Sequence, residues 1–370
     1  MAAKDEVVTR PTFVVVLAAG EGTRMRSSRP KPLHHLCGRP MVLYVLDAAT
    51  HDEVRATVVV VGHGATWVEK ALTERARADV HLTFVEQYEQ LGTGHAVSVA
   101  LPTIEDESGG AEGDVLILPG DTPLLRAATV GSLLAQHRQS QAALTVLTAI
   151  VADPSGYGRI IRDKDGSVAR IIEERDATTS ERSITEVNTS IMVVRKSLLG
   201  PALRRVDRQN AQNQYYLTDL IAVLHDTGHE TKAVLLDDAT EAQGVNDRLQ
   251  LAEAEAALRT RINERWMKRG VTMWDPAHTY VDADVVLAPE VSLLPGCVLK
   301  GHCVIQRGAQ IGPNANLSDV YVGENARVGM VEATNAHVGA DATVHSFVVM
   351  TPGSKVDNAE VVAPFEYRTR

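Results

Sequence analysis

Small residues, two glycines and several cations follow an apolar run near the amino terminus. In the segment LAAGEGTRMRSSRPKPLHHL, which spans residues 17–36, Gly20 and Gly22 precede Arg24 and Lys31. Small residues let the backbone approach a ligand closely, and successive backbone N–H groups in such a turn form a concave anion site. The two cations add positive charge, so the segment predicts a site for an oligophosphate. A strand–helix turn with solvent-facing arginines is the alternative interpretation.

The elements around this turn indicate an α/β domain. Apolar, β-branched runs bounded by glycine, proline or aspartate alternate with amphipathic stretches up to about residue 240. Unbroken runs of this kind indicate a parallel sheet that is covered on both faces. Ligands of such sheets bind beyond the carboxyl ends of the strands, where the glycine turn is expected to lie. The predicted strands are residues 13–17, 57–61, 82–85, 115–118, 144–150 and 191–194.

Two further sequence patterns follow, a helical periodicity and a six-residue repeat. Residues 246–269 have helical periodicity, which ends at Gly270. After it, aliphatic residues recur at every sixth position from Leu287 to Leu317, each two positions after a small or β-branched residue. The period then slips, breaks where Thr334 occupies the expected apolar position, and resumes at Val338. Such hexapeptide repeats predict a parallel β-helix, here of roughly four to five coils.

Composition limits the partners and the location. A net charge of −10 over 370 residues argues against nucleic acid and anionic membranes as partners. The amino terminus is polar, and no apolar run near it is long enough to span a bilayer. Cys37, Cys297 and Cys303 form no CxxC pair, which favours a reducing, cytoplasmic setting. Since Cys297 and Cys303 occupy small positions of the repeat, we expect them to be structural.

Several segments carry a family resemblance. The run L-A-A-G-x-G-T-R-M followed by P-K-P-L resembles the signature of the sugar-nucleotide pyrophosphorylases. Further segments occur in order: QYEQLGTGHA, LPGDTPLL, GYGRI, EVNTSI, NAQNQYYLTD and GVNDRLQLAEAE. Together with the repeats, they resemble the bacterial bifunctional N-acetylglucosamine-1-phosphate uridyltransferase/glucosamine-1-phosphate acetyltransferase family over about residues 12–350.

The resemblance implies a fold and a domain organisation. The fold is an α/β, Rossmann-like nucleotidyltransferase domain with a mostly parallel sheet, followed by a connecting helix and a short left-handed parallel β-helix. We expect these parts at residues 1–245, 246–270 and 271–370. The substrates implied are UTP and N-acetylglucosamine 1-phosphate, the cofactor is Mg²⁺, and the assembly is a homotrimer formed through the β-helix.

The resemblance also implies three groups of site residues, besides Arg24 and Lys31 as catalytic cations. The nucleotide-binding residues would be Leu17, Ala18, Ala19, Gly20, Gln87, Gly92, Thr93 and Gly120. The sugar-phosphate-binding residues would be Gly158, Glu173, Asn188, Tyr216 and Thr218. The metal ligands would be Asp121 and Asn246.

The residue types suit these roles. The amide of Gln87 offers a donor and an acceptor, which matches the imide edge of uracil. Asp121 follows a predicted strand, and a carboxylate beside a triphosphate needs a bridging cation such as Mg²⁺. Asn246, taken without the resemblance, is better interpreted as the N-cap of the following helix. We assign no chemistry to His95.

The resemblance implies an in-line displacement. The oxygen of the sugar 1-phosphate is already a nucleophile at neutral pH, so no general base is needed. It would attack the α-phosphorus of UTP and release pyrophosphate, while the protein supplies positioning and charge neutralisation. Arg24 and Lys31 would offset the phosphate charge as it redistributes.

Some positions depart from the family pattern. Asn213 and Gln214 stand where the family has a glycine and a glutamate, and the segment between Gly158 and Glu173 is about one residue longer. These changes leave the sugar open. Nucleotide transfer to another hexose 1-phosphate, a non-catalytic scaffold and an acyltransferase are therefore the alternatives to the uridyltransferase.

The acetyl-transfer half of the family is expected to be absent. Thr351-Pro352-Gly353 occupies the position of an R-P-G turn whose arginine belongs to that site. A threonine cannot neutralise a substrate phosphate. The later lysine and histidine segment of the family does not occur before Arg370. We therefore expect the β-helix to serve assembly.

Overall fold

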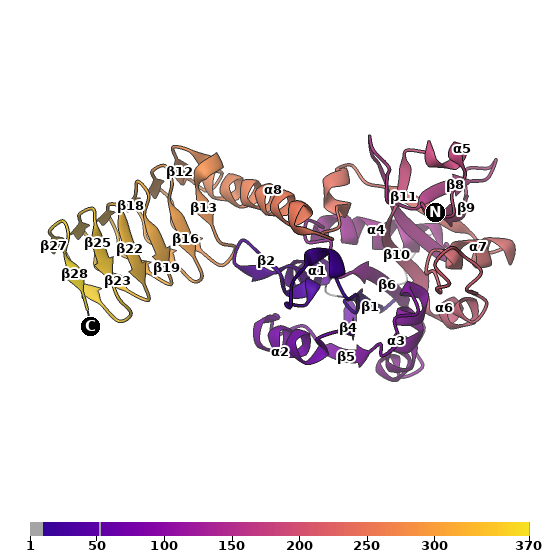
Figure 1. The fold of residues 1–370 in the computed structure, drawn as a ribbon. Coiled ribbons are helices and arrows are strands. Elements are labelled where there is room, and N and C mark those ends of the chain that lie inside the picture. Colours follow the sequence, from indigo (N-terminus) through magenta and orange to yellow (C-terminus); the bar gives the residue numbers. More distant parts are fainter. Residues whose placement is uncertain (1–9, 52, 370) are drawn as a thin grey trace, which may run out of the picture. The chain divides into compact units, whose positions relative to one another are not determined.

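The computed structural model describes residues 10–51 and 53–369 (Figure 1). The contacts within the chain divide it into two units. The first contains residues 10–34 and 40–250, and the second contains residues 35–39 and 251–369. The predicted three-part division stays a prediction.

A nine-stranded sheet forms the centre of the first unit. Its main path is β11-β7-β10-β6-β1-β4-β5, with β8 paired to β10 and β9 paired to β8. The pairs β1–β4, β1–β6, β4–β5 and β7–β11 are parallel, whereas β10 is antiparallel to both β6 and β7. Along this main path the sheet is therefore mixed but mostly parallel, as predicted, whereas β8 is antiparallel to both β10 and β9.

The bounds of these strands include all six predicted runs. The strands are β1 Thr12–Leu17, β4 Val54–Val61, β5 Leu82–Glu86, β6 Asp114–Pro119, β7 Leu144–Ile150, β8 Arg159–Arg162, β9 Val168–Ile172, β10 Glu186–Arg195 and β11 Thr231–Leu235. A separate short ladder pairs β2 His35–Leu36 with β3 Arg39–Pro40.

Helices cover both faces of the sheet because its central strands are apolar on both sides. On β1, Phe13 and Val15 belong to one buried cluster, and Val14 and Val16 belong to another. Helices α3, α6 and α7 contribute to the first cluster, and α1, α2 and α4 to the second. The helices are α1 Met41–Ala49, α2 Ala65–Arg75, α3 Thr93–Ser108, α4 Ala127–Ser140, α5 Thr179–Arg182, α6 Lys196–Leu203 and α7 Asp219–Asp226.

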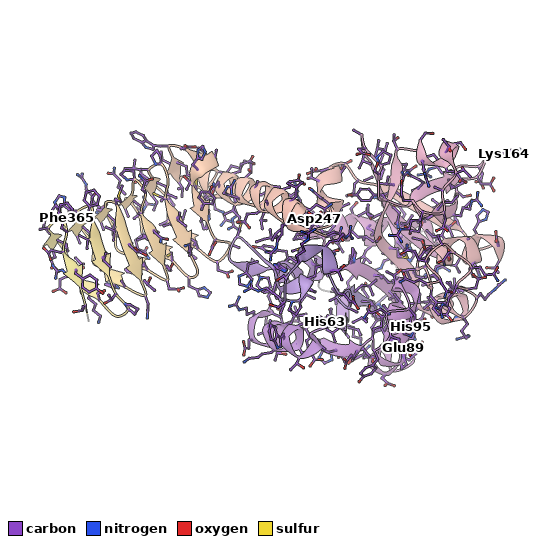
Figure 2. All side chains as sticks on the ribbon, in the orientation of Figure 1. His63, Glu89, His95, Lys164, Asp247 and Phe365 are labelled. Carbon is purple, nitrogen blue, oxygen red and sulfur yellow. The ribbon has the colours of Figure 1, made fainter. Side chains whose placement is uncertain are left out.

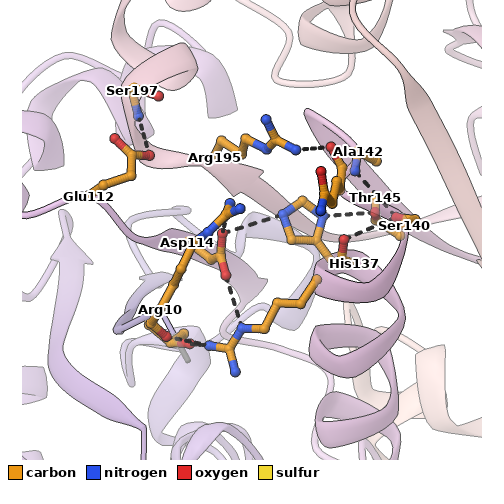
Figure 3. Close-up of polar contacts among 12 residues, drawn as sticks. Arg10, Glu112, Asp114, His137, Ser140, Ala142, Thr145, Arg195 and Ser197 are labelled. Atoms are coloured by element: carbon orange, nitrogen blue, oxygen red, sulfur yellow. Dashed lines mark hydrogen bonds and ion pairs between the residues drawn. The ribbon is translucent and has the colours of Figure 1, made fainter. Parts of the chain in front are cut away.

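A closed network of charges lies at the amino ends of β1 and β6 (Figure 3). Asp114, at the start of β6, has a fully buried side chain. Arg138 Nε donates to Asp114 Oδ2 at 3.0 Å, and His137 Nε2 lies 3.5 Å from Asp114 Oδ1. Arg138 also pairs with Glu53 and donates to Thr12 Oγ1 at 2.8 Å. These contacts tie helix α4 to the sheet on the side opposite the glycine turn.

The second unit contains most of helix α8, Arg248–Met267, and three parallel sheets. The sheets wind as a left-handed β-helix whose inward column includes Leu293, Ile311 and Val344, each at most 1% exposed. Asn263 on α8 donates to the carbonyls of Pro276 and Thr279 at 2.8 and 2.9 Å, which joins the helix to the first coil.

The strands of the β-helix are short. They are β12 Thr272–Met273, β13 Tyr280–Val281, β14 Val286–Leu287, β15 Ser292–Leu293, β16 Val298–Lys300, β17 Val304–Ile305, β18 Gln310–Ile311, β19 Asn316–Ser318, β20 Tyr321–Val322, β21 Arg327–Val328, β22 Val331–Thr334, β23 His337–Val338, β24 Thr343–Val344, β25 Val348–Met350, β26 Lys355–Val356, β27 Val361–Val362 and β28 Tyr367–Arg368.

Two details of the repeat differ from prediction. The apolar position assigned to Thr334 belongs to Ala333, which is 2% exposed and pairs with Leu317. The coil from Leu317 to Ala333 advances 16 residues, whereas the coil from Leu299 to Leu317 advances 18, so two residues are lost and the repeat shifts without breaking. The estimate of four to five coils was also too low, because the sheets hold six, six and five strands. The first coil was missed because a 3-10 turn, Pro276–His278, interrupts its six-residue spacing.

The two late cysteines are structural, as expected. Cys297 and Cys303 are fully buried in the β-helix and form no disulfide. Burial raises the pKa of the Cys297 thiol to about 11 and also raises that of Cys303. Among the helices of the described residues, none combines the length and the hydrophobicity needed to cross a bilayer.

Candidate active site

A cleft of 680 Å³ opens at the carboxyl ends of β1 and β6. It is lined by residues that the sequence places far apart, and most of the predicted site residues are among them. The predicted residues that line it are Leu17, Ala19, Gly20, Arg24, Gln87, Gly92, Thr93, Asp121, Glu173, Asn188, Tyr216, Thr218 and Asn246. The other predicted residues, Ala18, Lys31, Gly120 and Gly158, adjoin residues of this lining.

The glycine turn has the close packing that its composition indicates. The N–H of Gly120 donates to the carbonyl of Leu17 at 2.9 Å, so the turns after β1 and β6 lie side by side. Gly22 has a φ of +64°, and a Cβ there would lie 2.6 Å from Lys31 Cβ. A larger residue at Gly22 would therefore be strained and would displace Lys31. The turn leads into a 3-10 helix, Thr23–Met25, which carries Arg24.

Two cations and two oxygen donors converge beside the cleft. Lys31 Nζ contacts Asp121 Oδ2 and donates to Asn246 Oδ1 at 2.8 Å. Arg24 also donates to Asn246 Oδ1, at 3.0 Å. The side chains of Lys31 and Asp121 are 14% and 24% exposed, so the pair is open to a ligand. The predicted catalytic cations and metal ligands therefore form one group.

Asn246 is held by the first turn of helix α8. Its N–H donates to Gln250 Oε1 at 2.7 Å, and Asp247 Oδ1 accepts from the N–H of Gln250 at 2.9 Å. Asp247, labelled in Figure 2, thus makes the bond expected of an N-cap residue, and the side chain of Asn246 faces the cations instead. This geometry argues against the interpretation of Asn246 as an N-cap.

The proposed base-binding end is built by the segment before helix α3. Gln87 is 3% exposed, and its Nε2 donates to the carbonyl of Gly92 at 3.1 Å and lies 3.1 Å from His95 Nδ1. The amide nitrogen is therefore engaged within the protein. Gly92 has a φ of +108°, and a Cβ there would lie 2.5 Å from the carbonyl oxygen of Tyr215. His95, also labelled in Figure 2, orients Gln87, a contact that the sequence did not reveal.

The other end of the cleft carries polar groups of the kind that bind sugars. Thr218 Oγ1 donates to Glu173 Oε1 at 3.1 Å, and the N–H of Asn188 donates to the carbonyl of Gly158 at 2.8 Å. Burial raises the pKa of Glu173 above its ordinary value, and the nearby charge of Asp176 adds to the rise. A Cβ at Gly158 would lie 2.8 Å from Ile171 Cγ2, so a larger residue there would disturb this wall.

The two ends share a hydrogen-bonded framework. The N–H of Tyr215 donates to the carbonyl of Leu91 at 2.8 Å, and the N–H of Gly94 donates to the carbonyl of Tyr215 at 2.9 Å. The N–H of Leu217 donates to Thr93 Oγ1 at 3.1 Å. The side chain of Thr93 therefore helps to position the segment that contains Tyr215 and Leu217, a role that the sequence around Thr93 did not indicate.

Several lining residues were not predicted. Tyr157 has a pKa raised by burial and by the charge of Asp121, and Gln250 supports Asn246 as described above. Both occur inside motifs that the sequence analysis singled out. The further lining residues outside the prediction include Gln90, Thr122, Ser155, Gly156, Gln212 and Gln214.

The two unusual positions of the NAQNQYYLTD segment differ in consequence. Asn213 has a φ of +52°, a left-handed conformation that asparagine tolerates better than other non-glycine residues. This explains how asparagine can stand where a glycine is usual. Gln214, by contrast, lines the cleft, so its neutral amide bears directly on the ligand.

The donor set suits a hard divalent cation. Within the described residues, no group of three or more histidine, cysteine, aspartate or glutamate side chains is arranged to hold a metal. The carboxylate of Asp121 and the amide oxygen of Asn246 instead converge on the ammonium group of Lys31, a point of positive charge. Mg²⁺ commonly binds through one or two protein oxygens and completes its shell with phosphates and water. The residues present therefore fit Mg²⁺ bound together with a nucleotide.

Known proteins resemble the chain over most of its length. A family model described as a MobA-like NTP transferase domain matches residues 14–213. The "Bifunctional protein GlmU" of Brevibacillus brevis is 42% identical over 351 residues, which are 95% of this chain and 74% of that protein. Proteins of the same name from Thermobifida fusca and Streptomyces avermitilis are 44% and 43% identical over 90% and 94% of this chain, and over 68% and 71% of their own lengths.

Proposed function

The chain belongs to the GlmU family, and we propose that its first unit is a uridyltransferase that makes UDP-N-acetylglucosamine and pyrophosphate from UTP and N-acetylglucosamine 1-phosphate. One observation carries this proposal. Arg24, Lys31 and Asp121 meet with Asn246 beside a 680 Å³ cleft, at the carboxyl edge of the sheet. A scaffold protein has no need for this grouping of opposed charges.

The nucleotide is placed with its phosphates toward the glycine turn. Gly20 has open space around its Cα, and the neighbouring turn of Gly120 packs against Leu17. Exposed backbone N–H groups at this turn support phosphate oxygens. The base then lies toward Gln87 and Gly92, which both line the cleft.

The reaction is an in-line attack on the α-phosphorus by a phosphate oxygen of the sugar 1-phosphate. A new phosphorus–oxygen bond forms as the bond to pyrophosphate breaks, and no proton must be removed from the nucleophile. The protein contributes positioning and electrostatic stabilisation. Arg24 and Lys31 provide the stabilisation, because both cations already lie at the group that faces the phosphates.

Asp121 and Asn246 are the residues that would hold Mg²⁺. When bound, Mg²⁺ neutralises phosphate charge and keeps the reacting phosphates close together. Lys31 contacts both residues, so it fixes their orientation toward the cleft in the protein alone.

The sugar 1-phosphate is placed between Glu173, Asn188 and Thr218. Glu173 accepts from Thr218 and has a second oxygen that can accept from a sugar hydroxyl. The hydroxyl of Tyr216 donates to Asp176 Oδ2 at 3.4 Å, which fixes its ring at the wall of the cleft. Gly158 keeps this wall open.

Pyrophosphate release tests the function directly. The purified chain is incubated with Mg²⁺, each of four nucleoside triphosphates and each of several hexose 1-phosphates. We expect turnover to be highest with UTP and N-acetylglucosamine 1-phosphate. Absence of turnover with every pair would contradict the proposal.

A second substrate class follows from Gln214. This neutral residue lines the cleft where the family usually has a glutamate. A different hexose 1-phosphate would therefore be preferred if the missing charge normally contacts the amino-sugar group. The same panel decides between the two, because the preferred sugar is the one with the highest kcat/KM.

The remaining assignments are proposals of the same kind. We place nucleotidyl transfer in residues 1–245, connection in 246–270 and assembly, as trimers, in the β-helix of 271–370. The loss of acetyl transfer stays a prediction. It rests in part on Thr351, whose hydroxyl donates to the carbonyl of Arg368 at 3.1 Å. UTP as substrate and three buried cysteines that form no disulfide support a cytoplasmic location.

A further inference from the structure

A buried guanidinium lies behind the sugar end of the cleft. Arg159 is the first residue of β8, and its side chain is 1% exposed. Arginine is rarely buried to this extent unless it is paired. It does not line the cleft, and no step proposed above uses it.

Three separate segments converge on this guanidinium. It donates to the carbonyl of Tyr157, to Glu174 Oε2 at 2.5 Å and to the carbonyl of Arg182 at 3.4 Å. Tyr157 belongs to the loop before β8, Glu174 follows β9, and Arg182 ends the short helix α5. Arg159 Nε has no hydrogen-bond partner in the part of the chain that the structure describes, so its burial is not fully compensated.

Each of the first two partners adjoins a wall of the cleft. Tyr157 lines the cleft itself, and its carbonyl leads into Gly158. Glu174 follows Glu173, which accepts from Thr218 at the sugar end. One cation therefore sets the spacing between the loop that carries Tyr157 and the carboxylate of Glu173.

We propose that Arg159 is a positioning residue for the sugar 1-phosphate, which acts by fixing Gly158 and Glu173 at the distance that the sugar requires. This inference rests on the proposed function, because it assigns the sugar to that end of the cleft. Arg159 does not touch the substrate. Its effect is on sugar binding, and the nucleotide end, built on the segment before α3, is independent of it.

The geometry of the side chain explains why arginine is needed. A guanidinium presents several N–H groups in a fixed plane, so it can hold two carbonyls and one carboxylate at once. A lysine ammonium at the same position keeps the charge but cannot reach all three acceptors in this geometry. The Arg159→Lys variant therefore keeps the positive charge and loses the contacts that set the distance between Gly158 and Glu173.

Arg138 provides a matched control. It is also a largely buried arginine, 9% exposed, that pairs with carboxylates, but it lies at the amino edge of the sheet. Arg138→Lys disturbs packing to a similar degree without touching either end of the cleft. Glu174→Gln is a milder test of the proposal, because Glu174 is 34% exposed and is tolerant of substitution.

The experiment measures the KM for each substrate and the dissociation constant for the sugar 1-phosphate by calorimetry, together with thermal unfolding. In Arg159→Lys, we expect the KM and the dissociation constant for the sugar 1-phosphate to rise about tenfold, and in Glu174→Gln about threefold. The KM for UTP should change by less than about twofold in both. Arg138→Lys should lower thermal stability and leave both KM values unchanged.

Two results would overturn the inference. One is a folded Arg159→Lys protein in which the two KM values rise together or neither rises. The other, if Arg159→Lys does not fold, is a Glu174→Gln protein with an unchanged KM for the sugar. Wild-type protein without turnover on any hexose 1-phosphate would instead refute the proposed function, and this inference would fall with it.

Discussion

A carboxylate is paired with a cation at both ends of strands β1 and β6, but the two pairs differ in their exposure to solvent. At the amino ends, Asp114 is fully buried against His137 and Arg138 (Figure 3). At the carboxyl ends, Asp121 is 24% exposed and meets Lys31 beside the cleft. Both edges pair a carboxylate with a cation. Only the carboxyl edge leaves that pair accessible to a ligand.

Asp114 and the carboxylates near the sugar end of the cleft have pKa values shifted in opposite directions. Burial opposes ionisation of Asp114, but hydrogen bonds from His137 and Arg138 outweigh it, so its pKa lies below the ordinary value. Near the sugar end, burial raises the pKa of Glu173, and it raises that of Asp219 to about 6 with the help of neighbouring carboxylates. The amino-edge charge therefore stabilises the fold, whereas the carboxylates around the cleft are held there at a cost to stability.

Removal of Lys31 should have the largest effect. Lys31→Ala deletes the cation that contacts both Asp121 and Asn246, so we expect turnover to fall about a thousandfold with little loss of thermal stability. Initial rates of pyrophosphate release measure it. Lys70→Ala, at a 75% exposed position on α2, is the control and should keep full activity. Near-normal turnover of Lys31→Ala would refute the assigned role.

A change at the amino edge should affect stability alone. In Asp114→Asn, His137 loses its carboxylate partner and Arg138 keeps the more exposed Glu53, so the free energy of unfolding should fall by about 3 kcal/mol. The kcat/KM of the folded protein should be unchanged. Urea denaturation and initial rates measure the two quantities.

The pH dependence of that loss checks its cause. Because the pKa of Asp114 is lowered in the fold, its stabilisation is present above the ordinary value of 3.8 and is lost as the pH falls through the folded value. The difference between wild type and Asp114→Asn should therefore shrink in acid. A difference that stays constant with pH would argue against the charge as its source.

A change in the cleft wall should alter the binding of one substrate. In Gly158→Ala, the new Cβ would lie 2.8 Å from Ile171 Cγ2 and 3.4 Å from Glu173 Oε1. We expect the KM for the sugar 1-phosphate to rise about tenfold and that for UTP to stay constant. Gly200→Ala on α6, where the nearest contacts are 3.6 Å away, is the control. Equal changes in both KM values would contradict a local effect.

The smallest effect is expected at Asp219. Since its folded pKa is raised to about 6, the folded protein binds more protons than the unfolded chain between pH 3.8 and 6, and stability falls as the pH rises through that window. Asp219→Asn should remove this slope and raise stability at pH 7 by about 1 kcal/mol, a value reduced for partial solvent exposure. Urea denaturation at pH 4 and pH 7 tests it; an unchanged slope would count against the shift.

Much of the fold could be predicted because burial leaves a clear pattern. Strands covered on both faces read as unbroken apolar runs, and all six predicted runs lie in strands. The antiparallel direction of β10 has no such signal, since an apolar run is the same in either direction. Strands β8, β9 and β11 were missed because they are short and less uniformly apolar.

The repeat was predictable in kind and less so in detail. Six-residue spacing indicates inward side chains, but a coil can lose residues while the column stays aligned, as in the 16-residue coil from Leu317 to Ala333. The correct inward residue is then a small one. The burial of Ala333 and its pairing with Leu317 in the neighbouring coil distinguish it from Thr334.

The site was predicted by residue type, and its connections were not. A glycine turn with cations indicates phosphate from the sequence alone. The contact of Lys31 with Asn246 joins residues 215 positions apart, and only the resemblance related them beforehand. Gln250 and Arg159 lie inside segments that the resemblance singled out, but their roles could not be predicted, because their partners are set by the fold.

Helix α8 covers one end of the β-helix, and this affects the end from which the coils unfold. Asn263 donates to two carbonyls of the first coil, and Ile262 and Trp266 are buried beside it. Coils of a solenoid contact only their neighbours, so their stabilities add along the axis. The covered coil is thus the anchored starting point of the prism, and denaturant should unwind the stack toward it from the opposite end.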